Sequence, residues 1–586
     1  MAEPTIHWLT WGEEAFALAR TRDVPVLLSI GAVWCHWCHV MDQTTFANAE
    51  VTSLIGDLFV PVRVDNDQRP DINARYNMGG WPTVAFLTPE GEVLTGGTYM
   101  PASSFAAALR QVSDYYRDNK ASVKSRSAQQ RARRKMLLTP QVAAEELTSS
   151  LVDGVYTQVV AAFDSTHGGF GEAPKFPQVD ALELALERYA RRGDARALKV
   201  VSETLRKMAA GGMYDHEAGG FFRYSTTRDW SVPHFEKMLE DNARLLILYL
   251  HAYQVTGEEW FHRTVEGIVD YVNTTLLCPE KNCFSGSQDA DEKYYALTRD
   301  QREGVKAPSV DSIAYTAWNA MIALAYLEAG AILERAGLTT VALQTLELLW
   351  QRGWVPGRGM CQHWHHGPKL PGWLPAQAWT ALAILAAYEY TGRSQWLEHA
   401  QSILDWAVEN LKTPEGSFQD IPASEGALGR LSEPEISLIE NAVISEALIR
   451  LSHLTDQSRY LDLARAALTV LQADVTRYGI MAAGYARVVE HVLTEPVRVV
   501  IVGATCETRV ENLKQAVWQR YLPNRAVVSI DAAKEPQRME ALGLQQKLSP
   551  CVYVCAGRTC LPPVQDTSEL ALVLARAAGP PEAPPI

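Results

Sequence analysis

The chain has 586 residues, 47% of them apolar and 21% charged, so it can bury several hydrophobic cores. Its 54 basic and 68 acidic residues give a net charge of −14, and this acidic balance argues against a nucleic-acid-binding protein. Nine scattered cysteines, an odd number, argue against a secreted disulfide framework. Residues 1–11 lack a signal-peptide pattern, and no apolar run is long enough to span a membrane. We therefore predict a soluble, cytoplasmic protein without membrane or nucleic-acid partners.

The first predicted elements alternate between strands and helices. An apolar strand leads into Cys35-His36-Trp37-Cys38, which opens a helix, and further strands follow. This β-α-β order followed by a β-hairpin predicts a thioredoxin-like domain over residues 1–120. The polar, basic segment 120–135 is expected to be a solvated linker or helix face. The predicted strands are 24–30, 59–64, 84–87 and one after a turn at 89–92, and the predicted helices are 35–46 and 49–58.

The cysteine pair has the spacing of a redox centre. Two cysteines three positions apart at a helix start lie close enough to form a disulfide. The free N–H groups and the positive dipole end of the helix stabilise a thiolate, and lower a cysteine pKa from about 8.5 to about 3.5–7.5. We expect Cys35 to be the nucleophile and Cys38 the resolving thiol, with protonated His36 making the pair more oxidising. Trp81-Pro82 is predicted to contain a cis-proline that faces the pair.

Three other interpretations of the pair remain open. Cys35, His36, Cys38 and His39 could ligate a metal, although a zinc site normally has further ligands elsewhere in the chain. The cysteines could also be buried and inert, or the domain could be a thioredoxin scaffold without redox activity. Both cysteines are present beside His and Trp at a helix start, so we favour redox chemistry and expect neither a metal nor a cofactor.

Short motifs spread along the chain form a specific set. They are Trp34-Cys35-His36-Trp37-Cys38-His39-Val40-Met41, Arg69-Pro70-Asp71, Gly79-Gly80-Trp81-Pro82, Gly211-Gly212-Met213-Tyr214-Asp215, Pro233-His234-Phe235-Glu236-Lys237-Met238-Leu239, Asp289-Ala290-Asp291, Trp318-Asn319 and Val554-Cys555 with Cys560. Over nearly the whole chain this set resembles the spermatogenesis-associated protein 20 family. The resemblance implies a thioredoxin-like domain fused to an (α/α)6 toroid similar to N-acylglucosamine 2-epimerases and six-hairpin glycosidases, and it implies no settled reaction.

The chain departs from the family pattern at three positions. Phe222 stands where a His is common, and Ile313 stands where a Lys is common, which weakens any transfer of sugar chemistry. Ser29 occupies the position of the buried acid of thioredoxin, so that proton acceptor for the resolving cysteine is missing.

Residues 141–490 are predicted to form helical hairpins. Short joints at Gly193, Gly257, Gly337, Gly392 and Asp456 alternate with long loops rich in Gly and aromatic residues, which places the two kinds of loop on opposite rims. The hairpins could form an open solenoid or a closed ring, and the family resemblance favours the ring. The clearest amphipathic stretches are 239–255, 315–335, 376–390 and 436–454.

A closed ring would gather the long loops around a central funnel, where a ligand would bind. Tryptophans there could stack on a sugar ring, and charged residues could bind hydroxyls or transfer protons. Each residue also has an ordinary explanation as a core side chain or a helix cap. We favour the cluster around His234, because two acids lie within three helical turns of it. The funnel candidates are Asp215, Arg223, Trp230, His234, Glu236, Asp241, Asp289, Asp291, Trp318, Asn319 and Trp379.

Residues 495–578 are predicted to form a small α/β module with strands 497–503, 526–530 and 551–555 and a helix 511–521. No G-x-G-x-x-G follows Gly503, so we expect no dinucleotide site. Cys555 and Cys560 flank a predicted turn. We hypothesise that they form a second dithiol that exchanges with the first pair, the alternative being two partly buried free cysteines. The Pro-rich residues 579–586 are predicted to be a disordered tail.

The predicted fold class is therefore multidomain, α/β plus all-α. Three functions remain open. The first is a thiol–disulfide oxidoreductase acting on a protein thiol or disulfide. The second is a carbohydrate epimerase or hydrolase that binds a small carbohydrate and has a regulatory thioredoxin-like domain. The third is a non-catalytic scaffold.

Overall fold

The computed structural model describes residues 5–137, 146–424, 427–504, 507–544, 550–557 and 559–578. The predicted tail 579–586, the first residues of the predicted toroid (141–145) and Arg558 lie outside these ranges. The chain divides into two compact units. The first comprises Met1–Gln141, Gln288–Asp291 and Gln419–Ile436, and the second comprises the remainder. Within the described ranges, no helix is both long and apolar enough to cross a membrane.

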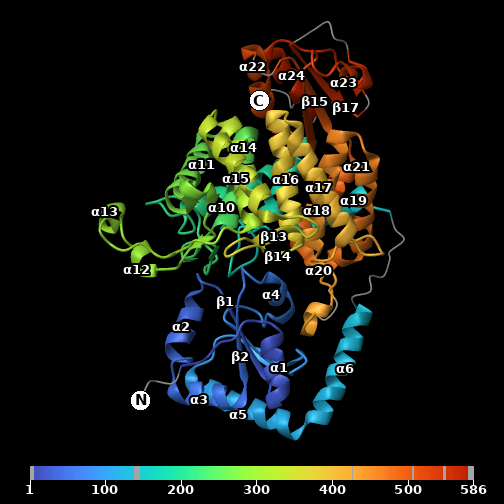
Figure 1. Ribbon diagram of the computed structural model, residues 1–586. Coiled ribbons are helices and arrows are strands. Elements are labelled where there is room, and N and C mark those ends of the chain that lie inside the picture. The colour runs from blue at the N-terminus through green and yellow to red at the C-terminus, as the bar shows by residue number, and fades with distance from the viewer. Residues whose placement is uncertain are drawn as a thin grey trace. The chain divides into compact units, whose positions relative to one another are not determined.

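The first unit is built on a four-stranded sheet in the order β2-β1-β3-β4 (Figure 1). β1 (Val26–Gly31) runs parallel to β2 (Val60–Asp65) and antiparallel to β3 (Thr83–Leu87), which pairs with β4 (Val93–Gly97). This confirms the predicted thioredoxin-like fold. The helices are α1 (Glu13–Arg22), α2 (His36–Thr44), α3 (Ala49–Leu58), α4 (Pro70–Tyr76), α5 (Ala102–Asp118) and α6 (Lys120–Leu137).

Both faces of this sheet are buried. Val26, Leu28 and Ile30 of β1 pack into one core with Phe16 of α1. Leu27 packs into the opposite core, which contains Phe105 of α5. Successive side chains of a strand point to opposite faces, so a strand covered on both sides is an unbroken apolar run. That is why the sequence alone predicts this strand.

Two segments from the middle of the sequence complete the first unit. Arg75 of α4 forms a buried ion pair with Asp420 at 2.7 Å and donates to the Glu433 carbonyl at 2.8 Å. Arg134 of α6 pairs with both Glu92 and Glu433 at 2.8 Å. The basic segment predicted as a solvated linker or helix face is therefore a helix, and part of its charge is paired within the unit.

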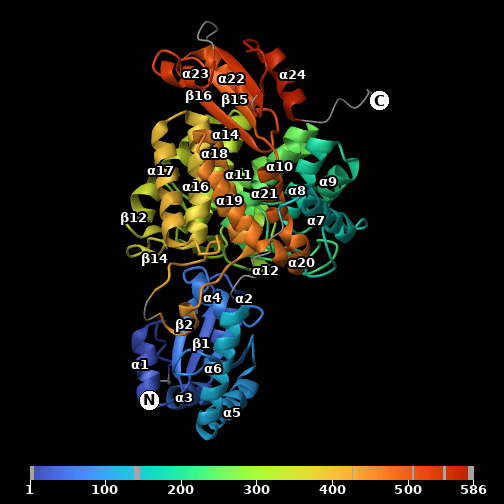
Figure 2. The same ribbon diagram turned by 90° about the vertical axis from the view of Figure 1, so that its right-hand side faces the viewer.

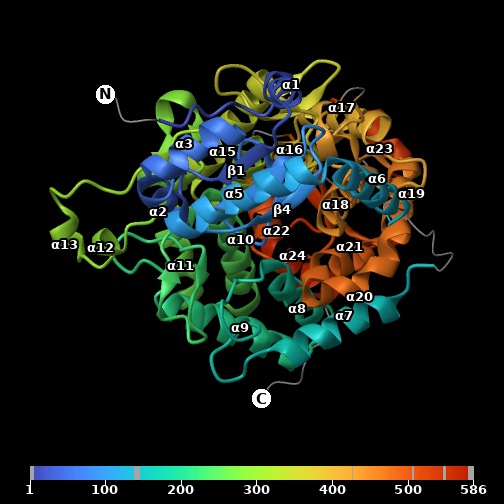
Figure 3. The same ribbon diagram turned by 90° about the horizontal axis from the view of Figure 1, so that it is seen from below.

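The second unit contains a closed ring of six inner helices among the described residues, and Figure 3 looks along the ring axis. The inner helices are α8 (Val179–Arg192), α10 (Leu239–Thr256), α14 (Thr316–Ile332), α16 (Leu374–Thr391), α18 (Leu438–Thr455) and α21 (Ala483–Leu493). Each contacts the next, and α21 contacts α8. This closure confirms the (α/α)6 toroid and excludes an open solenoid.

Each inner helix packs against an outer helix. Five outer helices follow their inner partners in sequence, namely α9 (Ala195–Ala210), α11 (Glu259–Tyr271), α15 (Ala336–Leu348), α17 (Ser394–Asn410) and α19 (Ser458–Leu471). The partner of α21 is instead α7 (Ser149–Ala162), from the start of the unit. The last hairpin is thus made from both ends of the toroid sequence.

Most short joints between these helices end in a left-handed residue, as predicted. The joint predicted at Gly337 is wrong: α14 ends at Ile332, Glu334 adopts φ 56°, and Gly337 lies inside α15. Glu334 takes the left-handed conformation there without a glycine, so no glycine marks the joint. The left-handed residues at the other four joints are Gly193, Gly257, Gly392 and Asp456.

A repeated amide clamp ties the long loops to the inner helices. Asn242, the fourth residue of α10, accepts the Phe221 N–H at 2.7 Å and donates to the Phe221 carbonyl at 3.0 Å and to the Met238 carbonyl at 2.9 Å. A side-chain amide has both a donor and an acceptor, so it satisfies both backbone groups of one loop residue. The same three bonds join Asn319 to Phe284, Gln377 to Met360 and Asn441 to Phe418, each amide being the fourth residue of its helix.

The clamps hold the long loops at the N-terminal ends of the inner helices. The loops contain short elements, which are β5 (Tyr224–Ser225), β6 (Pro233–His234), β7 (Lys237–Met238), β8 (Leu277–Cys278), β9 (Cys283–Phe284), β10 (Ser287–Gln288), α12 (Glu292–Tyr295), α13 (Arg299–Arg302), β11 (Val310–Asp311), β12 (Trp354–Val355), β13 (Gly359–His363) and β14 (Lys369–Pro371), with α20 (Val475–Tyr478) before α21.

The C-terminal module is part of the second unit. Its sheet has the order β16-β15-β17-β18, with β15 (Val497–Val502), β16 (Arg525–Ile530), β17 (Cys551–Ala556) and β18 (Thr559–Cys560). Its helices are α22 (Thr508–Trp518), α23 (Pro536–Ala541) and α24 (Thr567–Ala578). The module contacts α14, α16 and α18 of the ring (Figure 2). Arg525 pairs with Glu328 at 2.9 Å, and the Val527 N–H donates to Glu389 at 3.0 Å. The module is therefore docked on the toroid by buried polar contacts.

Candidate functional site

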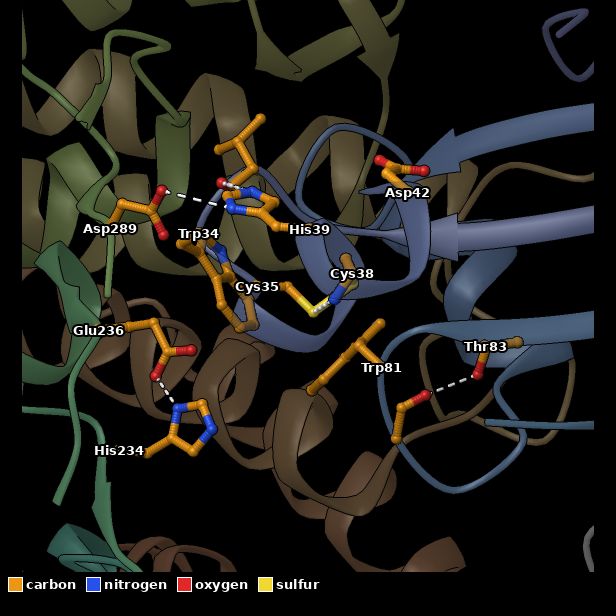
Figure 4. Close-up of a disulfide and its surroundings, with 12 residues drawn as sticks. Trp34, Cys35, Cys38, His39, Asp42, Trp81, Thr83, His234, Glu236 and Asp289 are labelled. Atoms are coloured by element: carbon orange, nitrogen blue, oxygen red, sulfur yellow. Dashed lines mark hydrogen bonds and ion pairs between the residues drawn. A yellow bond between two sulfur atoms is a disulfide. The ribbon is translucent and has the colours of Figure 1, made fainter. Parts of the chain in front are cut away.

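The cysteine pair lies at the N-terminus of α2 (Figure 4). Cys35 is the N-cap residue and forms a disulfide with Cys38, with Cα atoms 5.2 Å apart. The Cys38 N–H donates to the Cys35 sulfur at 3.2 Å. The predicted pairing is confirmed, and the donor that would stabilise a thiolate is in place. Among the residues that the structure describes, no group of three His, Cys, Asp or Glu side chains could hold a metal ion.

Aromatic side chains surround the pair. Trp34 packs edge-on against Trp81 with ring centroids 5.7 Å apart, and Trp37 packs against Tyr99 at 5.1 Å. The Trp81–Pro82 peptide bond is cis, as the sequence predicts. Trp37 is 47% exposed, which is unusual for so large an apolar side chain. An exposed aromatic side chain beside a redox pair is suited to contact a polypeptide partner.

A buried carboxylate that the sequence reasoning missed supports this loop. Asp67 is only 4% exposed and accepts hydrogen bonds from the Trp34 indole at 2.6 Å and from the Asn66 amide at 2.7 Å. It fixes the side chain that directly precedes Cys35. Its sequence signal is the Asp-Asn-Asp run at residues 65–67, which begins with the last residue of β2. Ser29, at the position of the thioredoxin acid, is buried within β1.

Solvent access to the two sulfurs is restricted. Cys35 is 4% exposed and Cys38 is 9% exposed, whereas His36 and Trp37 between them are exposed. Reactive cysteines are normally at least partly accessible. Exchange with a protein partner therefore requires a local movement that uncovers the sulfur of Cys35.

Asp289 and Asp291, which we predicted in the funnel, belong to the first unit. The Asp289 carboxylate forms an ion pair with His39 Nδ1 at 3.8 Å (Figure 4). The other ring nitrogen of His39 lies 2.9 Å from the Val33 carbonyl. Asp289 thus belongs to the surroundings of the cysteine pair.

A second cluster of charged residues lies at the N-terminal ends of the inner helices. Arg244 of α10 donates to Asp180 of α8 at 2.6 Å. Burial, together with the negative charge of Asp241, raises the pKa of Glu240 to about 7. Burial likewise raises the pKa of Asp241 to about 6 and that of Glu440, from α18, to about 7. Glu240 and Asp180 contribute to the rise at Glu440, so three inner helices bring their carboxylates together.

The carboxylates in this cluster have free hydrogen-bonding capacity. Asp241 Oδ2, Glu440 Oε2 and Glu236 Oε1 are buried without a hydrogen-bond partner among the described residues. Trp318 hydrogen-bonds to Glu240. The Arg244 guanidinium lies 6.0 Å from the Trp379 ring. Carboxyl groups with raised pKa values beside indole rings can bind a polyol and transfer protons.

The structure brings part of the favoured His234 cluster to this site. The positive charge of Arg223 offsets part of the rise in the pKa of both Glu240 and Asp241. The negative charge of Glu236 adds to the rise in the pKa of Asp241. His234 forms a hydrogen bond through Nδ1 with Glu236 and stacks on the Tyr224 ring. Arg223, Glu236 and Asp241 therefore share one electrostatic environment.

Three other predicted funnel residues stabilise the structure of the loops. Trp230 is fully buried, and its indole donates to a backbone carbonyl of an earlier loop. Asp215 is buried and accepts from Lys237 at 2.7 Å and from Arg302 at 2.8 Å. Asn319 is one of the four amide clamps.

Sequence reasoning missed Asp180, Glu240, Arg244 and Glu440. The signal of the three carboxylates was an acidic residue in the first turn of an inner helix, and Arg244 had no such signal. An acid at that position is the usual complement to the helix dipole, so the pattern alone does not separate a site from a cap.

Comparisons with known proteins agree with this organisation. A family model named Thioredox_DsbH and described as a protein of unknown function, DUF255, matches residues 1–135. Spermatogenesis-associated protein 20 of Homo sapiens is 25% identical over 714 aligned residues, covering 97% of this chain and 90% of the human protein. The resemblance inferred from the motifs is confirmed over nearly the whole chain.

Two further similarities concern one unit each. The thiol:disulfide interchange protein DsbD of Citrobacter koseri is 31% identical over 102 residues, covering 16% of this chain and 18% of DsbD. The solved cellobiose 2-epimerase of Bacillus thermoamylovorans has 11% identity and a TM-score of 0.47, covering 59% of this chain and 100% of the epimerase. The chain combines a thioredoxin-like domain that resembles part of DsbD with an (α/α)6 toroid, and the closed helix ring described above carries the toroid assignment.

Proposed function

We propose that this relative of spermatogenesis-associated protein 20 is a thiol–disulfide oxidoreductase whose redox centre is Cys35 and Cys38. The observation that carries the proposal is the disulfide at the N-terminus of α2, with the Cys38 N–H donating to the Cys35 sulfur at 3.2 Å. The same N–H and the helix dipole favour a thiolate at Cys35 once the pair is reduced.

The reaction follows from the positions of the two sulfurs. The Cys35 thiolate attacks one sulfur of a partner disulfide, which forms a mixed disulfide and releases the other partner sulfur as a thiolate. Cys38 then attacks the Cys35 sulfur, which regenerates the internal disulfide and frees the second partner thiol. Two electrons pass from the cysteine pair to the partner. The partner is a protein disulfide, since Trp37 offers an exposed aromatic contact beside the pair. The scattered cysteines favour a reducing, cytoplasmic location.

Insulin reduction and thiol alkylation test this proposal. We expect Cys35→Ser to abolish turnover and Cys38→Ser to trap the mixed disulfide, whereas Cys278→Ser, which removes a half-buried free thiol, leaves turnover unchanged. The rate of Cys35 alkylation against pH should give a pKa below about 7.5. A Cys35 pKa of 8.5 or more, or sulfurs that stay unreactive in the folded protein, would contradict the proposal.

A second function is supported by the carboxylate cluster of the toroid. Glu240, Asp241 and Glu440 have raised pKa values, and two of them have unpartnered buried oxygens. This arrangement favours a small carbohydrate as ligand, bound through its hydroxyls and stacked on Trp318 or Trp379. In a screen of oligosaccharides by calorimetry, binding should survive Cys35→Ser and be lost in Glu240→Gln. If no sugar binds, the toroid is a scaffold and this second function is rejected.

A further inference from the structure

The C-terminal module carries a second disulfide. Cys555 on β17 and Cys560 on β18 are directly opposite each other in the antiparallel pair and are bonded through their sulfurs. β18 is the edge strand of the sheet. Cys555 is 3% exposed, whereas Cys560 is exposed. One sulfur of the bond therefore belongs to an exposed residue at a sheet edge, and the other belongs to the sheet interior.

An arginine lies opposite the buried cysteine. Arg498 on β15 is directly opposite Cys555 on β17, so their side chains lie on the same face of the sheet. The Arg498 guanidinium donates to the His453 carbonyl at 2.9 Å and to Asp456 at 2.5 Å. These bonds hold the cation on the side of the sheet that faces the toroid. A guanidinium beside a cysteine stabilises its thiolate and makes it a better leaving group.

Both cysteines are among the residues that line a pocket of about 1000 Å³ between the module and the toroid. Arg498 and Val500 of β15 line it with the two cysteines, as do Leu397 of α17 and His453 of α18. The opposite face of the sheet packs against the module helices, through side chains such as Val499 and Ile501. The face with the disulfide therefore has room for a reacting group. By contrast, Cys551 on the same strand is fully buried.

We propose that Cys555–Cys560 is a second redox-active disulfide whose substrate is a dithiol. One thiolate of the dithiol attacks the Cys560 sulfur, forming a mixed disulfide and releasing Cys555 as a thiolate beside Arg498. The second thiol of the substrate then attacks the substrate sulfur that is bonded to Cys560. This forms the substrate disulfide and frees Cys560. The dithiol is oxidised by two electrons to a disulfide, and Cys555 and Cys560 are reduced and take up its two protons.

The test uses the full chain with Cys35→Ser and Cys38→Ser, so that the first pair does not contribute. The protein is equilibrated with mixtures of reduced and oxidised dithiothreitol, or with reduced thioredoxin, and quenched with N-ethylmaleimide before peptide mass spectrometry. We expect Cys555 and Cys560 to be reduced together and reversibly, so that the quench alkylates both of them before Cys551. Reduction by thioredoxin would identify a protein dithiol as a source of electrons, and reduction by dithiothreitol alone would identify a small dithiol.

The role of Arg498 gives a second readout. Arg498→Gln should slow the reduction about threefold, because the leaving thiolate loses its neighbouring cation. Arg498→Lys should restore most of the rate, and Arg459→Gln, which removes another Arg–Asp pair of the unit, should have no effect. Alkylation of both cysteines without any reductant would overturn the proposal, as would a disulfide that opens only when the protein unfolds. An Arg498→Gln rate equal to that of Arg459→Gln would remove the proposed role of the cation.

Discussion

Replacing His251 should destabilise the part of the second unit where the C-terminal module meets the toroid. His251 of α10 lies between two carboxylates, with Nδ1 3.0 Å from Glu183 of α8 and Nε2 2.9 Å from Glu328 of α14. Glu328 also pairs with Arg525 of the module at 2.9 Å. A cavity of about 90 Å³ adjoins this network, and the Tyr521 ring lies 4.8 Å from the imidazole. The charge of His251 therefore links two ring helices to the module.

The size of the effect follows from the pKa of this histidine. Burial alone would lower it, but Glu183 and Glu328 together raise the pKa of His251 to about 10. A rise from 6.5 to about 10 corresponds to at most about 5 kcal/mol of unfolding free energy. Because the folded-state pKa is raised, this contribution is fully present below pH 6.5 and is lost as the pH rises toward 10. His251→Gln should cost about 3 kcal/mol at pH 7, since Glu328 keeps Arg525 as a partner.

Differential scanning calorimetry over a pH series measures this effect. We expect the variant to melt about 3 °C below the wild type at pH 7, and the two curves to converge near pH 10.5. His262→Gln is the matched control, since His262 pairs with surface Glu259 and its loss should cost less than about 1 kcal/mol. A gap that stays constant between pH 6.5 and pH 10.5, or equal melting at pH 7, would refute the role assigned to this charge.

Three further predictions concern buried polar groups. Burial raises the pKa of Glu440 to about 7, so its ionisation lowers the stability of the folded protein as the pH rises from 4.5 to 7. In calorimetry, the Glu440→Gln variant should therefore melt at a higher temperature than the wild type at about pH 8 and at the same temperature at about pH 4.5. Asn319→Leu leaves the N–H and carbonyl of Phe284 unpaired and should lower the free energy of unfolding by at least about 2 kcal/mol. It should also speed proteolysis of the loop that contains Phe284, and equal proteolysis rates would contradict the clamp. Arg75→Ala leaves Asp420 buried without its cation and should lower the free energy of unfolding by about 3–5 kcal/mol. It should also expose residues 419–436 to trypsin. Adding Asp420→Asn should recover part of the lost stability.

Local patterns made much of the fold predictable. The double-sided burial of β1 produces an apolar run, and the helix joints end in left-handed residues such as Gly257, so strands and hairpins could be placed from the sequence. The redox pair was predictable for the same reason, since its geometry depends on four consecutive residues at a helix start. The wrong prediction at Gly337 shows the limit of this approach. The sequence alone does not distinguish a glycine inside a helix from a glycine that ends one.

Non-local pairing was not predictable in this way. The closing hairpin joins α7 to α21, and segments 288–291 and 419–436 leave the toroid sequence to join the first unit. The amide clamps did leave a signal, since each is the fourth residue of an inner helix. That signal becomes visible only when the helix starts are known to a single residue, and boundaries of this kind are the least certain part of a sequence-based prediction.

The acids at the inner-helix starts show how a site differs from a set of caps. A carboxylate that only caps a helix is stabilised by the dipole, so its pKa should fall. The pKa of Asp180 is also lowered, but the cause is its ion pair with Arg244, which outweighs burial. Glu240 and Glu440 show the opposite shift, because burial and mutual repulsion outweigh the dipole at their positions. Helix capping therefore does not explain two carboxyl groups held at a cost to stability on one rim of the ring, beside the unpartnered oxygen of Asp241, and this favours the ligand-binding role that we propose for the toroid.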